Sequence, residues 1–501
     1  MISAFANTFR VPELRSRIIL TLFFLVIARV GSFITCPGVN ASVLQHWFDS
    51  LVNNQSGGGI AALFNIFSGG SLENCAIFSL GVMPYISASI MMQLLTAVWP
   101  ALGKLAKEEG GRQRIMQLTR YATIALCIFQ GTLLAISFET PGRSPFLQGI
   151  ESTIAQMGPL VSPEDAGFLF RVIVVLTLTS GTMLLMWLGD QITDRGIGNG
   201  MSLIISVGIL SRLPAGLMQA WKTFVPSAMG ASSQVKPIVL VLLIVFLLAV
   251  IASVITLTQG QRKIAVQYTK RVVGKKVYGG QTQYMPLKVN YAGVMPIIFA
   301  QALLVFPTTI ATMISQEHSM IHSFARALHD GVWHYVVYAF LIFFFSYFWV
   351  ATQFQPQQIA EDLKKYGGYV PGVRPGQDTA TFLDNVMTRL TFAGAVFLLF
   401  VAITPEILSR TLNVPNLTAQ FFGGTSLLIV VGVVLDTMRQ IETHLIERNY
   451  DGFLKKGRVR GYSVRTPEGR EDAQGQQKVV LVFSLLAVLL LAAAIYFVVN
   501  R

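Results

Sequence analysis

Apolar residues run along this chain in long stretches that short polar loops separate. A helix needs about 20 mostly apolar residues to cross about 30 Å of hydrocarbon, and about eleven stretches approach or reach that length. They predict a helical membrane protein that spans the bilayer many times and leaves no room for a large soluble domain. The expected spans are 18–35, 76–98, 121–138, 168–188, 201–220, 237–257, 291–314, 332–352, 386–404, 419–436 and 479–499.

The composition of the 501-residue chain agrees with lipid surroundings, since 53% of its residues are hydrophobic, only 13% are charged and the mean hydropathy is +0.57. Arg10, Arg15 and Arg17 lead into the first apolar stretch, and no small-residue cleavage site clearly follows it. We therefore expect that stretch to remain as a span rather than to be removed as a signal peptide.

Lysine and arginine gather in alternate loops. They cluster before the first span and after the second, sixth, eighth and tenth spans, whereas 36–75 contains none and 315–331 contains only Arg326. Because these residues accumulate on the cytoplasmic side of a membrane, we expect a cytoplasmic N-terminus. A C-terminus that follows an eleventh span would then lie outside.

The expected spans offer little for catalysis or ion coupling. Asp190, Glu406 and Asp436 fall at span ends, and one charge, Arg29, is found inside a span, where we interpret it as a structural anchor. The patterns HExxH, GxSxG and GxxxxGKS or GxxxxGKT are missing. A passive channel is therefore favoured over a secondary transporter or an intramembrane enzyme, and no catalytic residue, metal or cofactor is predicted.

The three cysteines, Cys36, Cys75 and Cys127, are too few and too scattered in the sequence to predict a disulfide framework. We interpret them as small apolar packing residues. Redox chemistry is not expected from the sequence.

Small residues interrupt a partly apolar run that begins at Ala61. Ser68, Gly69, Gly70 and Ser71 follow one another there, just before the second span. This favours a short half-helix that enters the membrane from outside, because irregular backbone at that depth is tolerated only where protein or a water-filled cavity shelters it. An exterior interfacial helix is the alternative.

The second span opens with Val82 and Ile86, which lie one helical turn apart on one face. Such a face either packs against another helix or lines a hole. Periodicity alone favours packing, because apolar stripes in helical bundles are usually helix contacts.

Several long blocks resemble the SecY family, whose members form the channel of the Sec protein-translocation complex. Gly69-Gly70 with 77–90 (IFSLGVMPYISASI) is similar to the family's plug and second helix, and 186–200 (MWLGDQITDRGIGNG) to its junction between the fourth and fifth helices. The resemblance runs in order from about Pro12 to Tyr462. Further matching blocks are 286–290 (PLKVN) with 292–296 (AGVMP) before the seventh helix, 370–376 (VPGVRPG) in a cytoplasmic loop and 422–430 (FGGTSLLIV) in the tenth helix.

The resemblance implies an all-α integral membrane fold, a bundle of ten transmembrane helices in two pseudo-symmetric five-helix halves. The chain adds an expected eleventh helix, which departs from the family's usual number. The implied divisions are a cytoplasmic N-terminal segment 1–17, an N-terminal half 18–225 with a plug at about 61–75, a C-terminal half 226–440 with cytoplasmic loops 259–290 and 354–385, a basic cytoplasmic linker 441–478 and the extra helix 479–501.

The resemblance also implies an hourglass pore for unfolded polypeptide, closed from outside by the plug. A ring of apolar side chains at its neck would exclude water and ions without holding any charge. Carried over by motif position, the ring is Val82, Ile86, Met201, Ile205, Ile298 and Ile429, in which Met201 departs from the usual branched aliphatic residue. The plug is Leu63, Phe64, Asn65, Ile66, Phe67, Ser68, Gly69, Gly70, Ser71 and Leu72.

A lateral gate is implied between the second and third helices on one side and the seventh and eighth on the other. Transmembrane segments would leave there into lipid. Its candidate residues are Ser87, Gln93, Gln301 and Phe306. Candidate partner-docking residues are Arg262, Lys263, Lys275, Lys276 and Arg374, although membrane topology alone also explains positive loops.

The partners that the resemblance implies are SecE-like and SecG-like small membrane subunits, the SecA motor ATPase, the ribosome, signal sequences with nascent polypeptides, and membrane lipid. SecDF and YidC are further candidates. The implied location is the bacterial plasma (inner) membrane.

Overall fold

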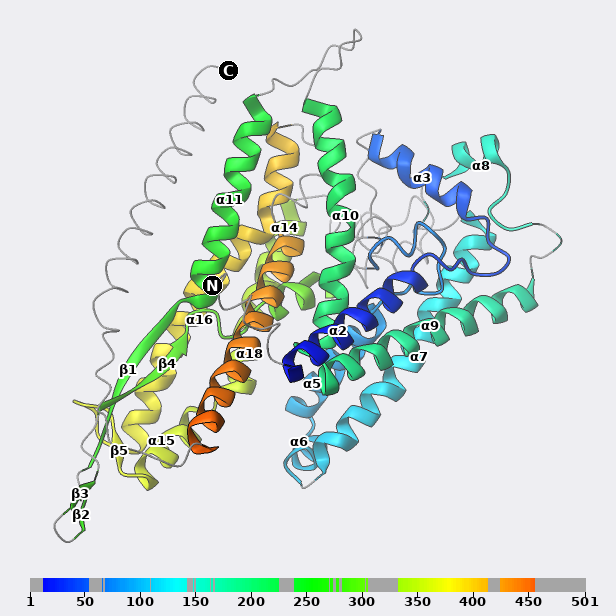
Figure 1. The fold of residues 1–501 in the computed structure, drawn as a ribbon. Helices are drawn as coiled ribbons and strands as arrows, with labels where there is room; N and C mark the ends of the chain where they lie inside the picture. Colours follow the sequence, from blue (N-terminus) through cyan, green and yellow to red (C-terminus); the bar gives the residue numbers. More distant parts are fainter. Residues whose placement is uncertain are drawn as a thin grey trace.

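The computed structural model is mostly helical, and two groups of long helices stand side by side with α10 (Gly200–Phe224) between them (Figure 1). The structure describes residues 12–53, 65, 68–108, 110–141, 147, 150–162, 164, 167–224, 238–269, 271–273, 276–278, 282–301, 303–304, 332–412 and 424–455. Its predominantly helical character agrees with the predicted class.

The first group of helices comes from the N-terminal part of the chain. Its members are α2 (Pro12–Gly31), α3 (Ala41–Asn53), α5 (Met83–Val98), α6 (Pro100–Lys107), α7 (Gly111–Glu139), α8 (Glu151–Met157) and α9 (Phe168–Arg195). α7 packs against α5 and α9, and α2 packs against α9 and α10. The short helices α3 and α8 contact each other at the end of the group opposite to α6 (Figure 1).

The second group comes from the C-terminal part of the chain. Its members are α11 (Ile238–Gln259), α14 (Val332–Gln353), α15 (Pro356–Lys365), α16 (Gln377–Leu412) and α18 (Thr425–Lys455), and residues 295–301 are helical as well. α16 packs against α14 and α15, and α18 packs against α10 and α11. The contact between α10 and α18 therefore joins the two groups.

A β-ribbon extends from the end of α11, beside α15 (Figure 1). β1 (Gln261–Tyr268) pairs antiparallel with β4 (Thr282–Lys288), β2 (Arg271–Val273) pairs with β3 (Lys276–Tyr278), and β5 (Gly368–Tyr369) adds to the end of β1. Ile264 and Val266 are buried two positions apart on one side of β1, as the period of a strand requires. The all-α prediction did not include these strands.

Five helices in the described part of the chain are long and apolar enough to cross a membrane, and α5 with α6 makes a sixth if the pair is one span bent by 105°. The predicted count of ten spans with an eleventh stays a prediction, because 305–331 and 456–501 lie outside the described residues. The five are Gln113–Glu139, Phe168–Arg195, Gly200–Met218, Trp333–Lys365 and Gln377–Pro405.

Three predicted span boundaries are wrong, because the predicted spans extend clearly beyond the helices. α2 ends at Gly31 rather than at residue 35, and α5 begins at Met83 rather than at residue 76. Thr35 and Ala76 instead form an isolated antiparallel bridge. The helix of the predicted seventh span begins at residue 295 rather than at residue 291. Pro84 lies in the first turn of α5, where a proline fits because the first N–H groups of a helix have no partner within it.

Residues 68–82 form consecutive turns, apart from the bridge at Ala76, and pack against α2 and α9. Gly181 of α9 makes the approach possible, because a Cβ there would lie 2.1 Å from the carbonyl oxygen of Ile77. The ring of Phe78 fills the space beside Gly31 of α2 and is only 2% exposed. The segment is therefore part of the packed interior and not a surface loop.

Candidate pore, plug and docking sites

The six predicted ring residues come from four separate segments. Val82 closes the turns before α5, Ile86 lies in the first turn of α5, Ile298 belongs to 295–301, Ile429 to α18, and Met201 and Ile205 to α10. Five of them are less than a tenth exposed and belong to one hydrophobic cluster, and Ile86 packs against that cluster while partly exposed. The side chains thus all belong to one buried apolar cluster or pack against it, which agrees with both the packing and the pore interpretations.

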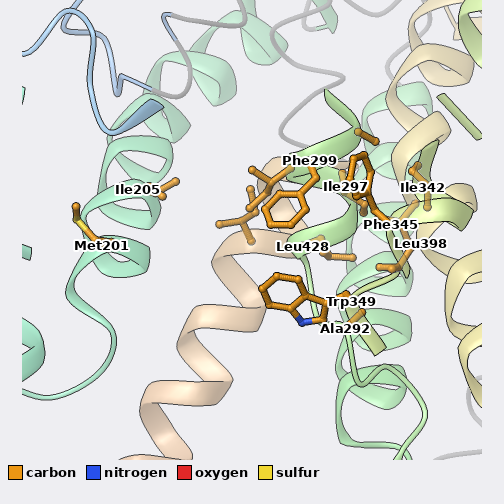
Figure 2. Close-up of a cluster of buried hydrophobic side chains, with 14 of the residues drawn as sticks. Met201, Ile205, Ala292, Ile297, Phe299, Ile342, Phe345, Trp349, Leu398 and Leu428 are labelled. Atoms are coloured by element: carbon orange, nitrogen blue, oxygen red, sulfur yellow. The ribbon is translucent and has the colours of Figure 1, made fainter. Parts of the chain in front are cut away.

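Helical spacing places these residues in pairs. The Ile86 N–H donates to the Val82 carbonyl oxygen at 3.1 Å, so the two lie one turn apart. Met201 and Ile205 have the same spacing on α10, and Figure 2 shows Ile205 projecting towards the side of the cluster that contains Phe299 and Leu428. α10 therefore presents an apolar edge to the C-terminal group of helices.

The described plug residues are Asn65, Ser68, Gly69, Gly70, Ser71 and Leu72, while Leu63, Phe64, Ile66 and Phe67 lie outside the described residues. From Ser68 onward the segment forms turns, and Asn65 is helical. The half-helix stays a prediction, because the rest of the run 61–67 lies outside the described residues. Short internal hydrogen bonds hold the segment. The Gly70 N–H donates to the Asn65 carbonyl oxygen at 2.8 Å, and the Ser71 hydroxyl donates to the Ser68 carbonyl oxygen at 2.8 Å.

Two arginines from the surrounding helices bind the plug. Arg29 of α2 donates from Nη1 to the Gly69 carbonyl oxygen at 2.9 Å. Arg212 of α10 forms an ion pair with Glu73, and the two side chains are 17% and 21% exposed. A Cβ at Gly70, where φ is +89°, would lie 2.5 Å from Arg212 Nη2, so only glycine permits this close approach.

Arg212 and Glu73 are the functional candidates that sequence analysis missed. The scan for charges inside spans found Arg29 alone, although Arg212 also lies inside the predicted fifth span. A basic residue in an apolar helix needs an acceptor, and Glu73 is an acidic residue in the segment proposed as the plug. Pairing those two features would have predicted the contact.

A small cavity of about 30 Å³ lies between the plug and the apolar cluster. Its lining is mixed, because it contains serines and Arg29 as well as Val82 and other apolar residues. A site of this size and polarity is large enough for a water molecule. Its main polar lining residues are Arg29, Ser32, Ser68 and Ser71.

The predicted lateral-gate residues are not brought together by hydrogen bonds in the described part of the chain. Gln93 is exposed, and its Nε2 donates to Ser89 Oγ within α5 at 3.5 Å. Ser87 is partly exposed. Gln301 Oε1 is buried and has no hydrogen-bond partner among the described residues, and Phe306 lies outside them.

The two predicted cytoplasmic docking loops form one structural unit. β5 pairs with β1, and the Tyr369 hydroxyl donates to Gln267 Oε1 at 3.0 Å. Arg374 follows in a tight loop and is exposed, and its carbonyl oxygen accepts a hydrogen bond from the Thr379 hydroxyl at 2.7 Å. Arg262 and Lys263 on β1 are also exposed, whereas Lys275 and the side chain of Lys276 lie outside the described residues.

These features define a polytopic helical membrane protein in which a buried apolar cluster adjoins a packed segment of turns that two arginines contact. A family model described as SecY matches residues 76–438. The chain is 42% identical to the protein translocase subunit SecY of Escherichia coli (strain K12), over 90% of this chain and 96% of the relative. It is 43% identical to the subunit of the same name from Halalkalibacterium halodurans, over 91% of this chain and all of the relative.

Two solved structures share the fold. One is described as the structure of a protein conducting channel (TM-score 0.59, 18% identity, 87% of this chain and 93% of that chain). The other is Sec61 in the canine ribosome-channel complex (TM-score 0.56, 17% identity, 87% and 93%). The chain therefore belongs to the SecY family, which confirms the predicted family and fold class.

Proposed function

We propose that this chain is the protein-conducting channel subunit of a Sec translocon, which passes unfolded secretory polypeptides across the membrane and releases transmembrane segments sideways into lipid. Its relatives at 42% identity are named protein translocase subunits, which makes a channel subunit the expected function and not an enzyme. The observation that carries the proposal is that ring residues from four segments belong to one buried apolar cluster beside the plug.

The proposed ring is Val82, Ile86, Met201, Ile205, Ile298 and Ile429. A narrow neck of such side chains excludes water and ions by dewetting and holds no fixed charge. Aliphatic side chains also yield around many kinds of translocating residue, because none of them leaves a desolvated charge or an unpaired polar group behind. A seal and a tolerant passage can therefore be made from the same atoms.

The plug is proposed to be held closed by Arg29 and Arg212. Their contacts, one to the Gly69 carbonyl oxygen and one to the Glu73 carboxylate, come from α2 and α10 on two sides of the segment. Both contacts have to break before the plug can leave. Because a charged hydrogen bond away from bulk water is stronger than an exposed one, they favour the closed state of an idle channel.

The lateral gate is proposed between Ser87 and Gln93 on α5 and Gln301 and Phe306 on the seventh span. A segment that contains Leu, Ile, Phe or Val gains about 0.3–0.6 kcal/mol per central residue on entering lipid, whereas polar chain stays in the pore. Gln301 Oε1 has no hydrogen-bond partner among the described residues. Opening this boundary should therefore cost less free energy than opening one whose buried polar groups are all hydrogen-bonded.

The N-terminus and the β-ribbon with α15 are proposed to lie on the cytoplasmic side of a bacterial inner membrane, because their basic residues follow the charge rule for loops. Exposed Arg262, Lys263 and Arg374 would then face ribosomal RNA phosphates or the SecA motor. SecE-like and SecG-like subunits would complete the translocon. The halves 18–225 and 226–440 are proposed to form its two sides.

The test is crosslinking to a secretory chain stalled during export. A photoreactive residue at Ile205, buried on α10, should crosslink to the stalled chain, because it would line the passage. The matched control is Leu210 on the same helix, which is 42% exposed and should crosslink to lipid or a neighbouring subunit. Equal labelling of the stalled chain from both positions, or none from Ile205, would overturn the proposal.

A further inference from the structure

Two of the three cysteines meet at one backbone junction. The Cys36 N–H donates to the Cys75 carbonyl oxygen at 2.7 Å, next to the bridge between Thr35 and Ala76. Cys75 departs from regular strand geometry, because its φ is +46° and its own N–H donates to the Leu72 carbonyl oxygen at 3.0 Å. The two cysteines therefore share one hydrogen bond, whereas opposed residues in a regular antiparallel pair exchange two and have Cα atoms about 5.5 Å apart. Disulfide-bonded cysteines have Cα atoms about 4.4–6.8 Å apart. The direct backbone hydrogen bond brings the two residues close enough for such a bond to be considered.

The two thiols share one environment. Cys36 is 2% exposed, Cys75 is 0% exposed, and both belong to the same buried apolar cluster as the side chains of α3 and α9. Both are free in this structure. Cys127 belongs to the cluster as well, but it lies within α7 and not in the backbone junction that joins Cys36 to Cys75.

Helix α3, whose side chains share the buried cluster with both cysteines, lies at the end of the molecule opposite to the β-ribbon (Figure 1). The chain between the two cysteines contains no lysine or arginine, as expected of an exterior loop. Disulfides form and persist outside the cytoplasm. The inference therefore rests on the orientation given in the proposed function.

We propose that Cys36 and Cys75 are a disulfide site, and that the bond ties the end of the plug nearest α5 to the end of α2. The oxidant is a small-molecule or protein disulfide outside the membrane. A Cys36 or Cys75 thiolate attacks one of its sulfur atoms, a mixed disulfide forms, and the second cysteine thiolate displaces the remaining thiol. The incoming disulfide is reduced to two thiols while the two cysteines lose two electrons and two protons.

Burial makes this reaction slow while the plug is closed. Burial raises the pKa of the Cys36 thiol to about 11, only partly offset by its hydrogen bond with Thr177. The pKa of the Cys75 thiol is also raised, by burial first and then by the neighbouring Cys36. Since the thiolate is the attacking species, the rate of disulfide formation should rise about tenfold per pH unit between about pH 7 and pH 9. The rate for an exposed thiol of pKa about 8.5 would instead begin to level off in that range.

The test uses the whole translocase in membrane vesicles, with Cys127→Ser so that Cys36 and Cys75 are the chain's only cysteines. The vesicles are treated with oxidised glutathione at about pH 8.5, remaining thiols are blocked with N-ethylmaleimide, and the denatured chain is cleaved at acidic residues. Asp49 and Glu73 lie between the two cysteines, so this cleavage separates Cys36 from Cys75 unless a bond joins them.

We expect one pair of peptides that is linked before reduction and separate after it. In Cys36→Ser and Cys75→Ser variants of the same chain, no linked pair of peptides should form, and the remaining cysteine should carry maleimide or, as an unresolved mixed disulfide, glutathione. Maleimide on both cysteines after oxidation, or a bond that joins two chains, would overturn the inference. Export of a secretory protein is measured in the same vesicles. If the unoxidised protein does not support export, that result counts against the proposed channel function and does not affect the disulfide result.

Discussion

Arg212 interrupts an otherwise apolar helix, and its position makes sense only together with the plug. A guanidinium at membrane depth is costly unless it meets an acceptor or water. Glu73 supplies the acceptor, and Asn65 orients Glu73 in turn by accepting from its N–H and donating to its carboxylate, both at 3.1 Å. The partners lie 139 residues apart, so hydropathy along the sequence could not show that they meet.

Replacing Arg212 with alanine would leave the Glu73 carboxylate without its cation. Because both side chains are mostly buried, the pair should be worth about 2 kcal/mol, more than a surface pair and less than a fully buried one. That loss shifts the ratio of closed to open plug by about 30-fold. We expect a higher ion conductance of idle channels in planar bilayers, and export of precursors that have defective leader peptides.

Arg171→Ala is the matched control for Arg212→Ala. It also removes an arginine from an ion pair, here with Glu139, but the Arg171 side chain is 47% exposed and lies in the first turn of α9. Idle conductance should stay at the wild-type level in this variant. If Arg212→Ala conducts no more than Arg171→Ala, the ion pair with Glu73 does not hold the plug.

At the scale of the elements, apolar runs predicted helices well and predicted the backbone path poorly. α9 begins at Phe168 and α14 at Val332, as predicted. Residues 77–82 lie in an apolar run yet form turns, because hydropathy measures transfer from water and not the direction of the backbone. β1 was missed for a related reason, since the alternation of Ile264 and Val266 is short and lies among charged residues.

Gly181 tests how tightly the turns 77–82 pack on α9. Gly181→Ala places a methyl group 2.1 Å from the Ile77 carbonyl oxygen, so the turns have to shift. Overpacking of this kind costs about 1–3 kcal/mol, which exceeds the gain of up to about 1 kcal/mol from alanine in a helix. We expect a lower unfolding temperature in detergent, measured by intrinsic fluorescence.

Gly131→Ala in α7 is the control for helix propensity. Its added Cβ would lie 3.7 Å from the nearest heavy atom, an ordinary contact, so the unfolding temperature should stay level or rise. The structure indicates that the turns pack tightly against α9. Equal unfolding temperatures for the two variants would contradict this.

At the scale of the whole molecule, α10 connects the parts that the proposed function needs. It carries Met201 and Ile205 of the ring, it holds the plug through Arg212, and it packs against α18 of the other group. The sequence pattern predicted apolar faces but favoured packing over a pore. The position of the ring came from the family resemblance, because a ring exists only where several helices meet.

The ring makes a prediction for the complete channel, since its seal depends on every contributing helix. Asparagine at Ile86, Ile205 and Ile429 would place amide groups in the apolar neck, where they retain water that aliphatic side chains expel. Idle conductance and export of precursors with defective leader peptides should both increase, whereas Ile244→Asn, at a 46% exposed position on α11, should change neither. If the three ring variants match Ile244→Asn in both measurements, the cluster is packing only, and the barrier to ions lies elsewhere.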